Sequence, residues 1–239
     1  MGTAVSISVL DPLDPSVVEE AFDEIRRLEA LFSRFRVDSE ISRIGRGDLG
    51  IEDADPLVQG VLERCDRLAA ETRGAFAHRY RSDGREILDP AAYVKGWAGD
   101  RAGAVLSAGG ARRYSLNVGG DVLAAGGTGK RPWRIGVRHP DHADAVMATL
   151  RIVDGAVATS GAYERGEHVR RRRSELRSVT VVGPELAMAD ALATAVFSSG
   201  SSAPPWFDSF PDYELMVVAG DRMFWTRGVD GMLEMPGGD

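Results

Sequence analysis

Short strand-like and helix-like segments follow one another along this chain without a regular order. Apolar residues at helical spacing predict helices over 17–35, 57–72 and 95–110, and alternating patterns predict strands at the start and repeatedly from residue 114 onward. A doubly wound parallel sheet would need a regular strand–helix–strand repeat. The order therefore favours an α+β fold, and no linker-like stretch divides residues 1–239, so one large domain with flanking helices is expected.

Two local signals refine this expectation. Ser16 follows the turn DPLDP and is expected to cap the first helix. Near the C-terminus, ELMVVAGDRMFWTRGV contains two β-rich runs joined at Gly220 and Asp221, which predicts a hairpin.

Composition excludes several classes of protein. The chain has 239 residues, of which 44% are hydrophobic and 27% charged, as in ordinary globular proteins. Its net charge of −7 argues against a nucleic-acid partner, which would require a basic face. The single cysteine, Cys65, cannot form an internal disulfide. No apolar run reaches the length of a membrane span.

The beginning of the sequence carries no basic start followed by an apolar signal segment. Taken literally, the chain is expected to be cytoplasmic. An extracytoplasmic location would follow instead if an export signal had been trimmed from its start.

Two glycine-rich stretches resemble nucleotide-binding loops only superficially. GGTGKR, around Lys130, has its first glycine misplaced, and Arg131 stands where a phosphate loop needs Ser or Thr to hold magnesium. NVGGDVLAAGG lacks the GxGxxG spacing of dinucleotide-binding folds, so Gly119 and Gly120 are expected to form a tight turn. Neither stretch predicts a nucleotide site of these two kinds.

The stretch DPAAYVKG contains Asp89 and Lys95 and reads as a turn that runs into a predicted helix. Backbone N–H groups at the beginning of a helix, together with the positive end of its dipole, can receive anionic oxygens. Lysine is rare in this chain, which has only Lys95 and Lys130. The segment therefore predicts a phosphate-binding site.

The stretch ATSGAYER ends a predicted strand in Thr159, Ser160 and Gly161. Hydroxyls and backbone amides at such a strand end could face a ligand. An ordinary loop capped by Ser160 explains the pattern equally well.

A carboxylate and a hydroxyl interrupt the apolar run AMADALATAVF. Asp190 and Thr194 are four residues apart, so on a helix they project from one face. Two such oxygens suit a hard cation such as Mg²⁺. A helix N-cap or a solvated stripe remains an alternative interpretation of this spacing.

Together, these segments resemble the ApbE family of flavin transferases (FAD:protein FMN transferases). Matching stretches occur in the same order over most of the chain, up to about residue 200. They are MGT at 1–3, FSRFRVDSEISRI, GAF at 74–76, DPAAYVKGWAGDRA, LNVGGDVLAAG, WRIGVRHP, ATSGAYER and SVTVVGPELAMADALATAVF. The resemblance implies an α+β domain with mixed sheets.

The resemblance also implies roles for individual residues. The positions expected to bind FAD are Met1, Phe35, Ala75, Phe76, Ala77, Asp89, Lys95, Thr159 and Ser160. The expected magnesium ligands are the carbonyl of Ala92 and the side chains of Asp190 and Thr194. Such a set is chemically reasonable, because Mg²⁺ prefers oxygen ligands and often takes some of them from substrate phosphates.

The implied reaction transfers FMN from FAD to a Thr or Ser hydroxyl of an acceptor flavoprotein of a redox chain and releases AMP. Two other functions remain open on the same residues. Water instead of a protein hydroxyl would make the chain an FAD pyrophosphatase that yields FMN and AMP. A chain with defective chemistry would be a catalytically silent FAD-binding protein.

Two positions depart from the family pattern. His168 matches the histidine that opens the family motif H-x-x-D-P-x-T-G and is the candidate catalytic residue, but Arg170–Arg173 follow where the rest of the motif is expected. Either a real deletion or a missing piece of sequence explains this. Ala77 stands where the family commonly has Asp after GAF, so a carboxylate contact to FAD is lost.

Overall fold

A seven-stranded sheet forms the centre of the protein in the computed structural model, which describes residues 2–82, 84–142, 144–161 and 176–234. Its strand order is β1-β4-β5-β8-β9-β10-β11, and every pairing is antiparallel. These strands are β1 (Val5–Val9), β4 (Tyr114–Val118), β5 (Asp121–Ala125), β8 (Gly155–Gly161), β9 (Leu176–Gly183), β10 (Glu214–Ala219) and β11 (Arg222–Trp225).

Two smaller sheets accompany the large one. One has the order β12-β7-β6, and the other is the β2-β3 hairpin. Their strands are β6 (Trp133–Arg138), β7 (Val146–Ile152), β12 (Leu233–Glu234), β2 (Arg79–Ser82) and β3 (Arg85–Leu88).

Five α-helices and three short 3₁₀ segments complete the described structure. The helices are α1 (Pro15–Phe32), α2 (Glu40–Arg46), α3 (Pro56–Glu71), α4 (Ala91–Ala108) and α5 (Leu186–Ser199). The 3₁₀ segments are η1 (Ile51–Asp53), η2 (Pro205–Ser209) and η3 (Arg227–Gly231).

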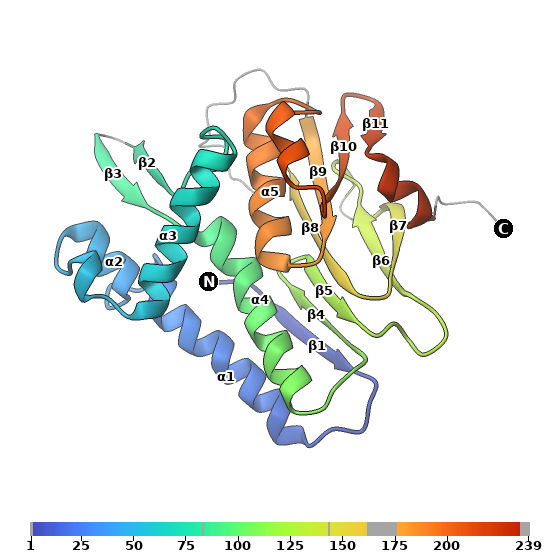
Figure 1. Cartoon of the computed structure of the whole chain (residues 1–239), viewed down its shortest axis with the longest axis horizontal. Helices are drawn as coiled ribbons and strands as arrows, with labels where there is room; N and C mark the ends of the chain where they lie inside the picture. Colours follow the sequence, from blue (N-terminus) through green and yellow to red (C-terminus); the bar gives the residue numbers. More distant parts are fainter. Residues whose placement is uncertain (1, 83, 143, 162–175, 235–239) are drawn as a thin grey trace.

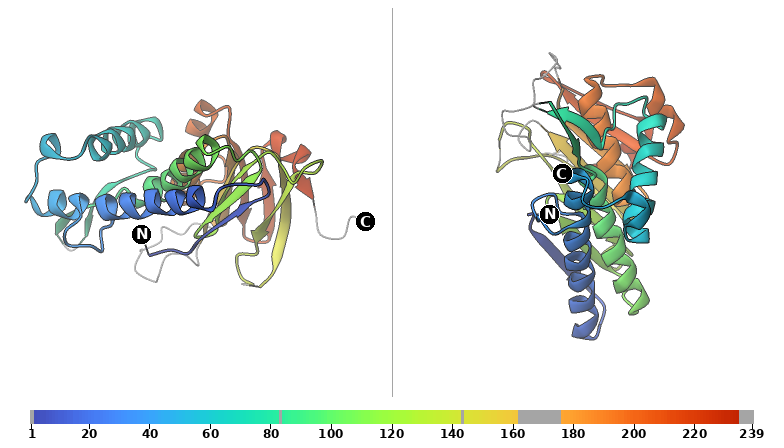
Figure 2. Two further views of the ribbon diagram at one scale, coloured as in Figure 1. Left: turned by 90° about the horizontal axis from the view of Figure 1, so that it is seen from below. Right: turned by 90° about the vertical axis from the view of Figure 1, so that its left-hand side faces the viewer.

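Helices α1, α4 and α5 cover one face of the large sheet, and the three-stranded sheet packs on part of the other face (Figures 1 and 2). Successive side chains of a strand point to opposite faces. On β9, Val179 and Val181 join the core beneath the helices, whereas Val182 joins a second core formed with β6 and β7. On β8, Ala156 and Ala158 lie under the helices, and Val157 lies on the other face. Even-numbered residues of β8 therefore face α5.

The α+β class predicted from the sequence is confirmed. The mixed sheets implied by the resemblance are not found, because each pairing between described strands is antiparallel. The predicted hairpin at Gly220 is present between β10 and β11. None of the described helices is long and apolar enough to cross a bilayer.

The N-cap of α1 differs from the prediction. Asp14, not Ser16, occupies it, and Oδ1 of Asp14 accepts a hydrogen bond from the Ser16 amide at 3.0 Å. Pro15 then takes the first helical position, where its missing N–H costs nothing. The proline therefore moves the cap two residues toward the N-terminus.

Candidate functional site

Helices α4 and α5 pack against each other unusually closely, and the candidate site lies at their contact (Figure 1). Gly96 of α4 lies beside the first residue of α5: a Cβ atom added at Gly96 would be 2.3 Å from the carbonyl oxygen of Leu186. Only glycine allows the two backbones to come this near. This packing brings Lys95, the neighbour of Gly96, into contact with Asp190.

Lys95 lies between two buried carboxylates. Its Nζ is 2.7 Å from Oδ2 of Asp121 and 3.5 Å from Oδ1 of Asp190. Asp121 is 1% exposed and Asp190 is 3% exposed. Burial raises the pKa of Asp121, while the Lys95 ammonium and the Thr159 amide act in the opposite direction. Carboxylates this deeply buried need such cationic or hydrogen-bonding partners.

The position of Asp190 excludes both alternative interpretations of its spacing. It is the fifth residue of α5, so it is not the N-cap, which is Glu185. It is also buried, so it does not belong to a solvated stripe. Burying a carboxylate in an apolar helix costs free energy, which favours a functional role for Asp190 in the ion cluster that Lys95, Asp121 and Asp190 form.

Ser160 and Thr194 link β8 to the same face of α5. Their hydroxyl oxygens are 3.1 Å apart. Ser160 is part of β8 rather than a loop, so the alternative of an ordinary capped loop is wrong. The strand thus holds the Thr194 hydroxyl one turn beyond Asp190.

Thr159 is placed differently from Ser160. Its hydroxyl lies 2.9 Å from that of Thr180, on the face of the sheet turned away from α5. Its backbone amide, however, donates to Oδ1 of Asp121 at 2.9 Å. Thr159 therefore contacts the ion cluster through its backbone and not through its hydroxyl.

The predicted magnesium ligands are compatible with a hard cation. Asp190 and Thr194 offer a carboxylate and a hydroxyl from one helix face, and Ala92 is half-buried one turn before Lys95 on α4. Across the described parts of the chain, no three His, Cys, Asp or Glu side chains gather as a metal centre. An ion here would thus depend on hydroxyl, carbonyl and substrate oxygens as well as on one carboxylate, which is a combination typical of Mg²⁺.

A second cluster of polar and aromatic groups surrounds Asp89. Arg34 Nη1 lies 2.8 Å from Oδ2 of Asp89 and 3.3 Å from the Tyr80 hydroxyl. The Arg34 guanidinium also lies over the Phe35 ring, 4.9 Å from its centroid. Phe35 is 72% exposed. An exposed aromatic ring beside a charged hydrogen-bonding pair suits a flat, polar-edged ligand.

The segment Ala75–Ala77 presents little side chain to solvent. Phe76 is 1% exposed and packs in the main core, contrary to a side-chain role in lining an FAD pocket. Ala75 is half-buried and Ala77 is exposed. This segment would therefore contact a ligand through its backbone and the two alanines. Met1 and His168 lie outside the residues that the structure describes.

Sequence reasoning missed two residues of the site. Asp121 directly follows the Gly119–Gly120 turn, which the structure confirms: both glycines have positive φ, and the Gly120 amide donates to Asn117 Oδ1 at 2.9 Å. From the sequence alone, NVGGDVLAAGG predicted only a tight turn and gave no sign of a role for Asp121. Arg34 was one of many arginines, and only its contact with Asp89 distinguishes it.

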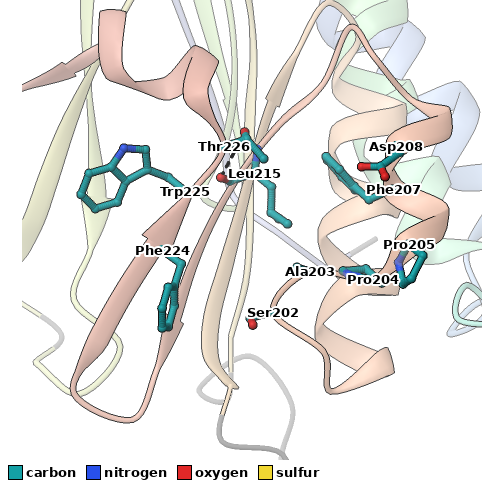
Figure 3. A pocket seen from close by; sticks show the side chains of 10 residues that line it. All are labelled: Ser202, Ala203, Pro204, Pro205, Phe207, Asp208, Leu215, Phe224, Trp225 and Thr226. Carbon is teal, nitrogen blue, oxygen red and sulfur yellow. Dashed lines mark hydrogen bonds between the residues drawn. The ribbon is translucent and has the colours of Figure 1, made fainter.

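A pocket of about 390 Å³ lies elsewhere, between η2 and the β10-β11 hairpin (Figure 3). Pro204, Phe207, Phe224 and Trp225 give it a largely apolar lining. None of the described residues predicted for the FAD or magnesium site lines this pocket.

Comparison with known proteins supports the resemblance. The ApbE family model matches residues 1–82 and 77–217. A protein of Rhodobacter capsulatus named FAD:protein FMN transferase is 37% identical over 131 residues, which cover 49% of this chain and 25% of the relative. A protein of the same name from Treponema pallidum is 26% identical over 211 residues, covering 75% of this chain and 58% of the relative. The chain thus spans only part of the length of these relatives.

Solved structures share the fold. The flavin transferase ApbE from Vibrio cholerae superimposes with a TM-score of 0.81 at 20% identity, covering 97% of this chain and 96% of that one. An ApbE protein from Thermotoga maritima gives a TM-score of 0.78 at 24% identity, covering 96% and 95%.

Proposed function

Because the chain belongs to the ApbE family, we propose that it transfers FMN from FAD to a Thr or Ser hydroxyl of an acceptor protein of a redox chain, releasing AMP. The acceptor oxygen would form a bond to the FMN phosphorus, the bond from that phosphorus to the AMP oxygen would break, and the hydroxyl proton would pass to a base. The names of the two relatives, both FAD:protein FMN transferase, support this choice of reaction.

The observation that carries the proposal is the meeting of Lys95, Asp190 and Thr194 where α4 packs on α5. Phosphoryl transfer is catalysed mainly by positioning and by neutralising negative charge. Asp190, Thr194 and the carbonyl of Ala92 would hold Mg²⁺, and Lys95 would offer its ammonium to the diphosphate. Bound Mg²⁺ would neutralise charge on the phosphate oxygens.

The cluster around Asp89 would bind the rest of FAD. Phe35 offers an exposed ring for stacking, and Asp89 would accept hydrogen bonds while Arg34 keeps it in place. Ser160 would orient the Thr194 hydroxyl. His168 is our candidate for the base that takes the acceptor proton.

The test is an incubation of the purified protein with FAD, Mg²⁺ and an acceptor domain known to be flavinylated. AMP is followed by chromatography and the acceptor mass by mass spectrometry, with a chelator control and a control lacking acceptor. We expect AMP and FMN-modified acceptor in equal amounts, and only with metal. AMP without acceptor modification would instead indicate an FAD pyrophosphatase, and intact bound FAD would indicate a silent FAD-binding protein.

An Asp190→Asn variant tests the metal assignment in the same assay. It keeps the size of the side chain but removes the carboxylate charge, so we expect a loss of rate of about 100-fold or more, as when a charge-stabilising group is removed from an active site. Asp23→Asn, an exposed carboxylate on α1, is the matched control and should retain full activity. Full Mg²⁺-dependent activity in Asp190→Asn would refute the assignment.

A further inference from the structure

Both carboxylate oxygens of Asp121 make contacts in the ion cluster, and only one of these contacts is with Lys95. Asp121 begins β5 directly after the Gly119–Gly120 turn, and its Oδ1 accepts the Thr159 amide of the neighbouring strand. Its other oxygen, Oδ2, faces Lys95 Nζ at 2.7 Å. One carboxylate thus joins a strand backbone to the lysine of α4.

Lys95 is shared unequally between its two carboxylates. The contact with Asp121 is shorter, at 2.7 Å, than the contact with Asp190, at 3.5 Å. Both carboxylates are almost completely buried, so each interacts with the ammonium in a medium that screens charge weakly. A divalent cation placed on Asp190 would repel an ammonium that remained beside the same carboxylate.

We propose that Asp121 is a positioning residue that retains the Lys95 ammonium when Asp190 takes a divalent cation. This inference rests on the proposed function, because it assumes that Asp190 is a ligand of Mg²⁺. Asp190 would then exchange its contact with Lys95 for one with the metal. Lys95 would stay on Asp121, where its ammonium can bind diphosphate oxygens that the metal does not neutralise. Without Asp121, the lysine would move onto Asp190 and compete with the metal.

The test measures Mg²⁺ binding without FAD, so it does not depend on turnover. The midpoint of thermal unfolding is recorded against Mg²⁺ concentration for the wild type and for Asp121→Asn, which preserves an acceptor for the Thr159 amide. We expect Asp121→Asn to require about tenfold more Mg²⁺ for half of the stabilisation, a factor that corresponds to roughly 1.4 kcal/mol. Asp11→Asn is the matched control, because Asp11 also binds an arginine side chain and backbone amides.

The double variant Asp121→Asn/Lys95→Met separates positioning from other roles. If Asp121 acts through Lys95, removing the competing ammonium should return the half-stabilising Mg²⁺ concentration to within about threefold of the wild-type value. A direct metal ligand or a merely structural residue would give no such recovery, and that result would overturn the proposal.

Lys95→Met alone supplies an independent measurement should Asp121→Asn fail to fold. We expect it to bind Mg²⁺ more tightly than the wild type, because Asp190 no longer has to give up its 3.5 Å contact with the ammonium when the metal binds. Unchanged or weaker binding would contradict the proposal. A wild-type chain that gains no stability from Mg²⁺ would overturn it too, whereas the proposed transfer reaction is decided separately by AMP release and acceptor mass.

Discussion

The Asp100 carboxylate of α4 accepts a hydrogen bond from the Leu186 amide at the first residue of α5, over 2.8 Å to Oδ1. Its second oxygen accepts the next amide, that of Ala187, also over 2.8 Å. The first amides of a helix have no partner within the helix. A side chain of α4 therefore completes the N-terminus of α5 and fixes the helix that carries Asp190.

Asp100→Ala should destabilise the protein. Both amides lose their acceptor, so we expect the free energy of unfolding to fall by about 1–3 kcal/mol. Asp100→Asn keeps one acceptor oxygen and should lose less. Urea denaturation of the wild type and the two variants measures their free energies of unfolding. Equal stability of Asp100→Ala and the wild type would show that water replaces the carboxylate without cost.

Gly96→Ala should separate the two helices. The new Cβ would lie 2.3 Å from the Leu186 carbonyl oxygen and 2.8 Å from Cα of Ala187, and both are backbone atoms that cannot rotate away. We expect a loss of about 1–3 kcal/mol in the free energy of unfolding, as for overpacking in a core.

Gly60→Ala on α3 is the matched control for this substitution. No atom lies within 4 Å of the added Cβ, so the helix propensity of alanine should raise stability by roughly 0.5–1 kcal/mol. Thermal unfolding of both variants compares the two positions. A similar effect at Gly60 and Gly96 would mean that close packing is not what Gly96 provides.

Much of the helical framework could be predicted because its signals are local. The helix that carries Asp190 and Thr194 was expected from its sequence and is found at Leu186–Ser199. The partners of its polar groups could not be predicted, because they depend on the register of distant strands. Asp121 reaches Lys95 only because β5 pairs with β8 so that its odd-numbered residues face the helices.

Other elements were missed because their signals are weak. The β2-β3 hairpin has four-residue strands, too short for a reliable alternation. Helix α4 was expected to begin at Lys95, yet it begins at Ala91 directly after Pro90. The earlier start places Ala92 in its first turn, which only the structure reveals.

His78 should make stability depend on pH. It is 2% exposed, and neither ring nitrogen has a hydrogen-bond partner among the described residues, although Asp66 Oδ1 lies 3.2 Å from Nε2. Burial lowers the pKa of His78 below its ordinary value of 6.5. The unfolded chain then takes up a proton at a higher pH than the folded chain, so stability should fall as the pH decreases below about 6.5.

The variant His78→Phe removes this titration and preserves a ring next to Phe76. Urea denaturation between pH 8 and pH 5 should show a smaller decrease in stability for the variant than for the wild type. Parallel curves would mean that the titration of His78 is the same in the folded and unfolded chains.

Arg34→Met should weaken FAD binding if Arg34 keeps Asp89 in position. The substitution removes the ion pair with Asp89 and the cation over Phe35, but retains a long apolar stem. The Arg34 side chain is 43% exposed, so losing this ion pair costs about 0.2–1 kcal/mol, which predicts a dissociation constant higher by up to about fivefold. Arg36→Met is the matched control, because Arg36 pairs with Asp38 in the same loop at the same distance of 2.8 Å but is not near Asp89 in any described contact. Quenching of flavin fluorescence measures both constants without Mg²⁺, and equal affinities would show that Asp89 does not need Arg34 to bind FAD.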